Sequence, residues 1–312
     1  MDVDGAKGCL NAFVQLKQQY SQLRVILSVG GQGKGSEHFA AVAHSRSKTE
    51  VFVRSARQLV DQYGLDGIDG KSWLDMMKIS FFFLRKTMNT EPSFSFSVDW
   101  EHPANSKEGK DYVRLLSKLR EVLPAPRYVL ATALPASQWF LRHIDLGAAQ
   151  KHLDMINLMT YDFFGPWESE AGHQAQLHGS PISGYSSVDY ALMQGIPAKK
   201  IILGVPVYGR SFLGCSGPGQ RYAGHGGEDG VFDYSELPRP GAQEIHDERA
   251  GAAYCVGSDG GFVTYDTPAT VKQKANFVTS SKLGGLFYWH ICSDARGPRS
   301  LLETGYNTLH EM

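Results

Sequence analysis

The chain has 312 residues, with 31 Lys and Arg against 32 Asp and Glu, and 42% of its residues are hydrophobic. This composition is that of a globular protein with a sizeable core, arranged as two domains or as one α/β barrel with an insertion. The net charge of −1, without a run rich in Lys and Arg, argues against nucleic acid as a partner, and no apolar run is long enough to span a membrane.

The start of the chain and the cysteines bear on its compartment. Residues 1–5 contain neither the basic region nor the apolar stretch of a secretory leader, so we expect a protein that stays inside the cell or one whose natural N-terminus is missing. The four cysteines are widely spaced and form no CxxC pair, which excludes a zinc ribbon and a redox motif. We expect free thiols in the core, or disulfides in one of three pairings that the sequence does not rank.

Strand-like and helix-like segments alternate along the chain, which predicts βαβ units around a parallel sheet. Ser47 and Glu50 have the spacing of a capping box, so a helix is expected to begin there and to end at Gly64. Further helices are expected at 112–122 and 267–284. Buried strands are expected at 24–31, 128–134, 155–161, 201–208 and 285–289.

Two gaps between the expected strands are longer than one βα unit requires. The gap after 201–208 leaves room for a small α+β insertion subdomain, expected at 212–264. The gap before 128–134 contains residues 70–97, which include three of the eight methionines and five of the sixteen phenylalanines but no alanine or valine. This composition is foreign to the rest of the chain, and without the segment Asp69 would be joined directly to Val98.

That join would produce a row of carboxylates. The sequence would read LDGIDVDWE, and Asp69, Asp99 and Glu101 would share one face of a strand because alternate strand residues do so. At the carboxyl end of a barrel strand, such a row points into the site that the βα loops form. Three adjacent carboxylates repel one another, so a proton is retained on or near Glu101 at neutral pH, and Glu101 becomes a candidate general acid.

This row resembles the DGxDxDxE signature of glycoside hydrolase family 18, the chitinases. Four other segments resemble motifs of that family in the expected order, namely SVGG at Ser28–Gly31, MTYD at Met159–Asp162, GVPVYGR at Gly204–Arg210 and GGLFYW at Gly284–Trp289. The likeness covers nearly the whole chain except 70–97 and points to fungal chitinases of the bacterial-like type. It implies an α/β protein with a (β/α)8 TIM barrel and a small insertion subdomain.

The resemblance also implies a reaction. It is hydrolysis of the β-1,4 linkages in chitin or chito-oligosaccharides, with retention of configuration and without a metal or cofactor. Glu101 would protonate the glycosidic oxygen while the acetamido oxygen of the substrate attacks the anomeric carbon to form an oxazolinium ion. Asp99 would orient that acetamido group, and Asp69, held by Ser28, would take up charge as Asp99 turns. Tyr161 would donate a hydrogen bond to the acetamido carbonyl.

The remaining residues of the implied site bind the sugar. Trp289 would form the floor of the subsite, and Trp167 could extend the aromatic surface to the leaving-group side. The same subsite would be lined by Met159, Asp162, Tyr208 and Arg210. The protein is expected to act as a monomer, and the sequence leaves endo or exo action open.

Several plainer interpretations stand beside these assignments. An Asp-x-Glu pair on a strand can be a solvated face, buried tryptophans can belong to the core, and Tyr208 and Arg210 could brace the barrel. The sequence GGQGKG lacks the GxxxxGK[ST] pattern of a phosphate loop, and neither HExxH nor GxSxG occurs. The rival function is that of a non-catalytic chitin-binding lectin, against which the presence of Glu101 argues.

Two departures from the family pattern put activity in doubt. The first two barrel strands should precede Cys9, and a barrel without them exposes sheet edges, so we expect a marginal or aggregation-prone chain. If the catalytic strand is built from 64–69, Asp99 and Glu101 lie outside that strand. If it is built from 94–101, Ser97 takes the place of Asp69.

Either arrangement breaks the carboxylate row. Because misplacement by about 1 Å can cost on the order of 10² in rate, we expect little activity from the chain as written. A translated intron at 70–97 together with a missing first exon would explain both departures. A genuine regulatory insertion is the rival explanation.

Overall fold

The structure is a computed structural model that describes residues 12, 15–16, 18–20, 26–31, 33–62, 77–84, 94–257 and 259–310. Cys9, Gly64 and Asp69, which figure in the predictions above, lie outside the described residues. The chain divides into two compact units. Unit 1 comprises 1–81, 87–157 and 191–201, and unit 2 comprises 82–86, 158–190 and 202–312.

The catalytic strand predicted above lies in the sheet of unit 1. This strand is β3 (Phe94–Asp99), which pairs in parallel with β1 (Ile26–Gly30) on one side and with β4 (Tyr128–Pro135) on the other. The second edge of β1 pairs antiparallel with β2 (Met77–Leu84), a strand within 70–97. The expectation of a bare sheet edge is therefore wrong at β1, whose backbone groups find partners on both sides.

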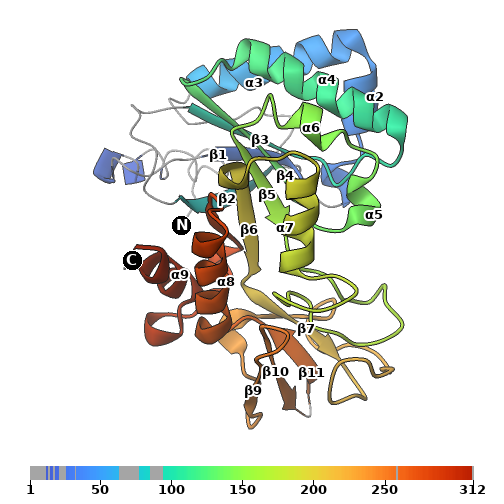
Figure 1. The fold of residues 1–312 in the computed structure, drawn as a ribbon, viewed down its shortest axis with the longest axis vertical. Helices are drawn as coiled ribbons and strands as arrows, with labels where there is room; N and C mark the ends of the chain where they lie inside the picture. Colours follow the sequence, from blue (N-terminus) through green and yellow to red (C-terminus); the bar gives the residue numbers. More distant parts are fainter. Residues whose placement is uncertain are drawn as a thin grey trace. The chain divides into compact units, whose positions relative to one another are not determined.

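Helices of unit 1 cover the outer face of β3 (Figure 1). They are α2 (Phe39–His44), α3 (Arg46–Gln62) and α4 (Ser106–Val122). Trp100 is buried and stacks on Phe39 with ring centroids 5.7 Å apart. The α3 helix begins one residue before the expected Ser47, because the Ser45 hydroxyl accepts a hydrogen bond from the Lys48 amide and so caps the first turn.

Shorter elements complete unit 1. The 3₁₀ turns are η1 (Gly33–Gly35) and η3 (Ala198–Lys200), and the short helices α5 (Gln138–Leu141) and α6 (Leu146–Ala149) follow β4. Strand β5 (Met155–Met159) and helix α7 (Gly184–Met193) each pass from one unit into the other. Among the described residues, no helix is long and apolar enough to cross a membrane.

Unit 2 contains a pair of parallel strands and an antiparallel sheet. Strands β6 (Ile201–Pro206) and β12 (Gly285–Trp289) pair in parallel, and α8 (Pro268–Ser280) packs on β12 and on α9 (Leu301–His310). The strands of the antiparallel sheet follow in spatial order. They are β8 (Val231–Asp233), β7 (Tyr208–Phe212), β11 (Gly261–Tyr265), β10 (Ala252–Gly257) and β9 (Glu244–Asp247).

The antiparallel sheet begins earlier than the predicted subdomain boundary. The strand expected at 201–208 ends at Pro206, and β7 starts at Tyr208. Between them, the Val207 amide donates to the carbonyl of Trp289 at 2.7 Å, next to the last residue pair of the β6–β12 register, Pro206 and Trp289. The remaining short turns of unit 2 are η4 (Tyr234–Glu236), η5 (Ile291–Ser293) and η6 (Gly297–Arg299).

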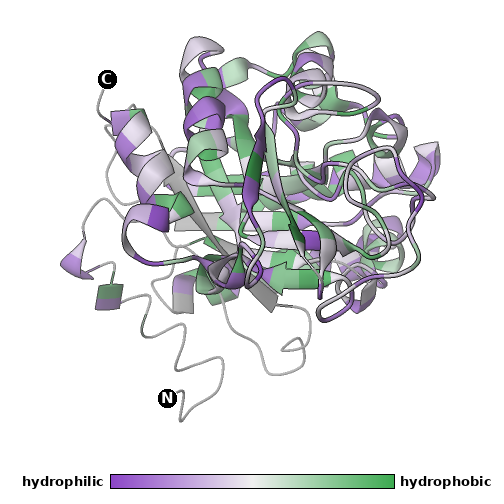
Figure 2. Ribbon diagram, turned by 90° about the horizontal axis from the view of Figure 1, so that it is seen from below, coloured by the Kyte–Doolittle hydropathy of each residue, from purple (hydrophilic) through white to green (hydrophobic). Residues whose placement is uncertain are grey.

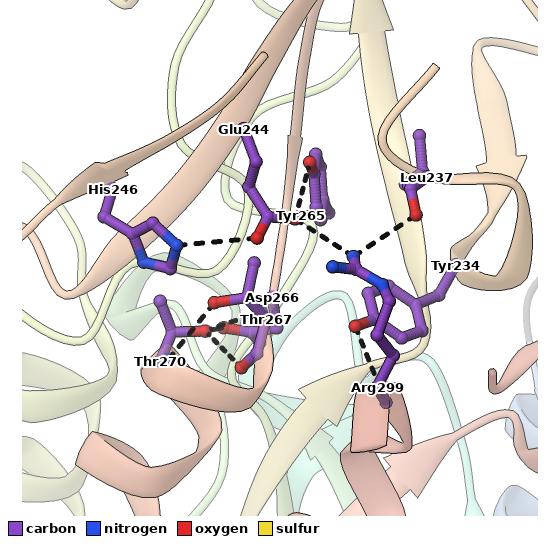
Figure 3. A network of polar contacts seen from close by, with 9 residues as sticks. All are labelled: Tyr234, Leu237, Glu244, His246, Tyr265, Asp266, Thr267, Thr270 and Arg299. Atoms are coloured by element: carbon purple, nitrogen blue, oxygen red, sulfur yellow. Dashed lines mark hydrogen bonds and ion pairs between the residues drawn. The ribbon is translucent and has the colours of Figure 1, made fainter. Parts of the chain in front are cut away.

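A polar network fastens β9 to the segment before α9 (Figure 3). The Arg299 guanidinium donates to the Glu244 carboxylate at 3.0 Å and to the Leu237 carbonyl at 3.2 Å. The Tyr265 hydroxyl donates to the same carboxylate at 3.1 Å, and the Tyr234 hydroxyl donates to the Arg299 carbonyl at 3.0 Å. Glu244 thus holds the outer strand of the antiparallel sheet to the C-terminal part of unit 2.

A buried ion pair lies beside this network. The Lys274 ammonium is 2.5 Å from the Asp266 carboxylate, and the two side chains are only 2% and 1% exposed. The Thr270 hydroxyl donates to the other carboxylate oxygen at 2.7 Å. Burial lowers the pKa of Lys274 and Asp266 counteracts it. The pair fixes the first turns of α8 to the end of β11.

Replacing Lys274 by methionine should destabilise the protein by about 3–5 kcal/mol, because it leaves the Asp266 carboxylate buried without its counter-ion. Chemical denaturation followed by circular dichroism measures this cost. The double variant Lys274→Met with Asp266→Asn should recover most of the loss. A single variant that loses less than about 1 kcal/mol would contradict the account of a buried, mutually dependent pair.

Figure 2 colours the ribbon by hydropathy, and its helices carry both hydrophilic and hydrophobic residues. The cysteines that the structure describes are all free. Of these, Cys255 is buried, Cys215 is half-buried and Cys292 is exposed, so only Cys255 is a core thiol of the predicted kind.

Candidate active site

Asp99 is the last residue of β3 and is only 8% exposed. Side chains alternate along the strand, so that Ser97 and Asp99 share one face while the buried Phe96 and Val98 lie on the other. Glu101 is half-buried. The structure therefore places Asp99 at the carboxyl end of a parallel strand, with Glu101 two residues beyond it.

The glycines of SVGG let the β1 backbone approach the end of β3. Gly30 has a φ of +126°, and a Cβ atom at that position would lie 2.0 Å from the Asp99 carbonyl oxygen. The Gly31 amide donates to the same oxygen at 2.7 Å. The Ser36 hydroxyl donates to the Gly31 carbonyl at 2.8 Å and accepts from the Glu101 amide at 2.8 Å. Ser36, which the sequence analysis missed, thus fixes the backbone of Glu101.

Ser97 occupies the position that the family pattern gives to a carboxylate. It lies opposite Ser28 in the β1–β3 register, and both side chains are buried. The second of the two arrangements considered above is therefore the one observed, with the strand built from 94–99. Among the described residues, the Ser97 hydroxyl has no hydrogen-bond partner. The expected contact between Ser28 and Asp69 stays a prediction, because Asp69 lies outside the described residues.

Two buried hydroxyls brace the strand behind Asp99. The Tyr112 and Thr132 hydroxyls are 2.6 Å apart, and the Thr132 hydroxyl is also 2.6 Å from the Val98 carbonyl. Burial raises the pKa of Tyr112, and the nearby charge of Asp99 raises it further, against the lowering effect of the bond to Thr132. Tyr112 therefore stays a neutral phenol that supports the end of β3 from α4.

In unit 2, the MTYD and GVPVYGR segments meet at one carboxylate. An Asp162 oxygen accepts hydrogen bonds from the Tyr208 hydroxyl at 2.6 Å and from the Arg210 Nε at 2.7 Å. Burial and then the charge of Asp162 raise the pKa of Tyr208. Burial lowers the pKa of Arg210, but its bond to Asp162 and the charge there outweigh this effect and raise it. Asp162 has a φ of +58°, a strained conformation that is frequent at functional sites.

Two aromatic rings pack against Tyr161. Its ring contacts those of Tyr208 and Phe287 edge to face, with centroids 6.3 and 5.9 Å apart. A Cβ atom on Gly204 would lie 2.8 Å from the Tyr161 ring, so this glycine makes room for the tyrosine. Met159 and Trp289 lie at the carboxyl ends of β5 and β12 and are half-buried.

An exposed tryptophan extends the unit 2 cluster. The Arg210 guanidinium lies 4.7 Å from the centre of the Trp167 ring, whose residue is 53% exposed. Gln174, which the sequence analysis missed, is fully buried, and its amide donates to the Tyr208 carbonyl at 2.7 Å. It comes from a loop without periodicity, so the sequence offered no signal for it. Trp167, Arg210, Asp162 and Tyr208 therefore form one connected group.

The described residues offer no cluster of three or more His, Cys, Asp or Glu side chains for a metal. Unit 1 presents a half-buried carboxyl group near a second, buried one, and unit 2 separately presents tyrosine hydroxyls, a carboxylate and aromatic faces. These groups suit proton transfer and the binding of a sugar.

Comparisons with known proteins identify the family to which the chain belongs. The sequence pattern described as "Glycosyl hydrolases family 18" matches residues 1–73 and 84–294. "Endochitinase 1" of Metarhizium robertsii is 32% identical over 97% of this chain and 69% of its own, and "Chitinase 1" of Aphanocladium album is 31% identical over 97% and 70%.

Solved structures agree in fold. A GH18 chitinase from Cycas revoluta, in complex with (GlcNAc)3, has a TM-score of 0.79 at 24% identity, over 98% of this chain and 85% of its own. A family 18 N-acetylglucosaminidase from Paenibacillus barengoltzii has a TM-score of 0.77 at 26% identity, over 96% and 86%. The fold class is therefore confirmed as that of the (β/α)8 barrel, and the chain belongs to glycosyl hydrolase family 18.

Proposed function

We propose that this chain hydrolyses the β-1,4 linkages between N-acetylglucosamine units in chitin and chito-oligosaccharides, with retention of configuration. The observation that carries the proposal is the position of Asp99 at the carboxyl end of β3 and of Glu101 two residues later, where the Glu101 amide donates to the Ser36 hydroxyl. Three of the named relatives are chitinases, and the solved chitinase among them is in complex with (GlcNAc)3.

In the proposed reaction, the Glu101 carboxyl gives its proton to the glycosidic oxygen as the bond from that oxygen to C1 breaks. The carbonyl oxygen of the 2-acetamido group forms a bond to C1 from the opposite face, which yields an oxazolinium ion. The Glu101 carboxylate then takes a proton from a water molecule, whose oxygen attacks C1 and breaks the bond to the acetamido oxygen. The two inversions at C1 give net retention.

The other predicted site residues act on the sugar that reacts. Asp99 orients the acetamido group and stabilises the positive charge that develops on it. Tyr161 donates a hydrogen bond to the acetamido carbonyl, and Trp289 stacks against the apolar face of the ring. The same sugar is contacted by Met159, Asp162, Tyr208 and Arg210, while Trp167 serves the leaving-group side.

A pair of substrates tests the proposal. Because the nucleophile belongs to the substrate, a sugar without the acetamido group cannot react by this route. We expect chromatography to show shorter oligosaccharides released from chitohexaose and none from cellohexaose. Cleavage of both at similar rates would contradict substrate assistance.

A second function, chitin binding with little turnover, is favoured by one observation. Ser97 stands at the register position where the family has a carboxylate, so the charge that would assist Asp99 is missing from β3. Chitohexaose that binds in calorimetry but is not cleaved would support this lectin-like alternative.

We further propose that 70–97 is a translated intron. The family pattern supports this proposal, because it does not match residues 74–83 within that segment.

A further inference from the structure

A glycine-rich turn that the proposed reaction does not use lies next to the segment that carries Glu101. The sequence of 30–36 is GGQGKGS, and its described residues are 30–31 and 33–36. The turn leaves β1 after Gly30, which lies opposite Asp99 in the last pair of the β1–β3 register. It therefore starts beside the end of β3, two residues before Glu101.

The glycines fold the turn back onto the end of β1. A Cβ atom on Gly35 would lie 2.5 Å from the Gly30 carbonyl oxygen, so a side chain at position 35 would collide with the backbone of β1. Gly33 has a φ of +65°, and its carbonyl accepts a hydrogen bond from the Ser36 amide at 3.1 Å. Ser36 itself is only 9% exposed. The turn thus holds the Ser36 side chain against the strand that it leaves.

Backbone atoms on both sides of Trp100 bind this turn. The Asp99 carbonyl accepts from the Gly31 amide at 2.7 Å, and the Glu101 amide donates to the Ser36 hydroxyl at 2.8 Å. The Trp100 ring between them is buried and stacks on an aromatic ring of α2. Three consecutive positions are therefore fixed, and the position of the Glu101 backbone depends on the turn.

The Ser36 hydroxyl suits this position because it donates and accepts at once. Its single proton goes to the Gly31 carbonyl at 2.8 Å, and the Asp99 carbonyl is a more distant second acceptor at 3.4 Å. Its lone pairs then accept from the Glu101 amide. Alanine at position 36 would remove the bonds on both sides. The Glu101 backbone would then be able to shift away from β1, and its carboxyl group would shift with it.

We infer that Ser36 is a positioning residue for the general acid and that it decides how well the chain cleaves bonds with poor leaving groups. The inference rests on the proposed function. A sugar oxygen must receive a proton as it leaves, whereas a phenol is more acidic and leaves more readily as an anion. Misplacement of the Glu101 carboxyl group should therefore slow the release of a sugar far more than the release of a phenol.

The test compares two substrates on the same chain. In Ser36→Ala, kcat/KM for chitohexaose should fall about tenfold, while kcat/KM for a fluorogenic chitotrioside with a phenolic leaving group should fall less than about threefold. The ratio of the two values does not depend on the fraction of the chain that is folded. Ser36→Thr keeps the hydroxyl and should restore most of the ratio.

Two further variants complete the comparison. Ser45→Ala is the matched control, because it removes a hydroxyl that accepts from the Lys48 amide at the start of α3, and its ratio should equal that of the parent chain. If Ser36→Ala does not fold, Ser36→Cys gives the same comparison with a smaller fall in the ratio, because a thiol has a similar shape but is a weak acceptor.

The outcomes separate the inference from the proposed function. A parent chain that cleaves chitohexaose, with a ratio that neither Ser36→Ala nor Ser36→Cys lowers, would overturn the role of Ser36 alone. An equal fall for both substrates would do the same, because it would mean a general loss of structure rather than a misplaced acid. A parent chain that cleaves neither substrate would overturn the proposed function and the role of Ser36 with it.

Discussion

Replacing Glu101 by glutamine should lower the hydrolysis of a fluorogenic chitotrioside by at least about 10²-fold. Glutamine has nearly the same shape but cannot give a proton to the leaving oxygen, and such a proton transfer contributes about 10²–10⁴ in rate. Affinity for chitin should persist, because the backbone bond between Glu101 and Ser36 is retained. Fluorescence release and chitin pull-down measure the two quantities separately.

Glu121→Gln is the matched control, since the Glu121 side chain is 57% exposed on α4 and pairs with Lys118. Its turnover should equal that of the parent chain. Unchanged turnover in Glu101→Gln would remove Glu101 from the role of the acid.

Replacing Ser97 by aspartate should raise turnover on the same substrate by on the order of 10², the lower range for a group that assists proton and charge movement. The change restores a carboxylate at the position opposite Ser28, next to Asp99 on the same face of β3. It leaves β2 in place, whereas deleting 70–97 would also remove the partner strand of β1.

Ser97→Asn separates charge from size, because asparagine has the shape of aspartate without its charge. We expect no gain in turnover from Ser97→Asn. The denaturation midpoint of both variants should also be measured, because burying a second carboxylate beside Asp99 opposes folding. An equal gain from both variants would show that volume rather than charge limits the reaction.

Elements with strong local patterns were predicted well from the sequence. The strand at 285–289 has the expected bounds, and β4 extends the expected 128–134 by one residue, because short apolar runs bounded by turn residues specify buried strands. The helix expected from Thr267 begins at Pro268 with the Thr267 cap, although it ends at Ser280. Local propensity and capping act over a few residues, which a sequence displays directly.

Contacts between distant residues were not predictable in the same way. The segment expected as one strand at 201–208 is divided at Val207 because β7 pairs with β8 and β11, which lie far away in the chain. Ser36 and Gln174 hold Glu101 and Tyr208 through single bonds across 65 and 34 positions. The parallel pairing of β3 with β1 places Ser97 opposite Ser28, and this register is set by whole strands rather than by a local pattern.

The most direct test of the central claim, that Glu101 is the acid of a family 18 hydrolase, is the turnover of a fluorogenic chitotrioside in two chains. One carries Ser97→Asp, and the other carries Ser97→Asp together with Glu101→Gln. We expect clear hydrolysis by the first chain and a loss of about 10² or more in the second, with chitin binding retained by both. Equal hydrolysis by the two chains would contradict the claim.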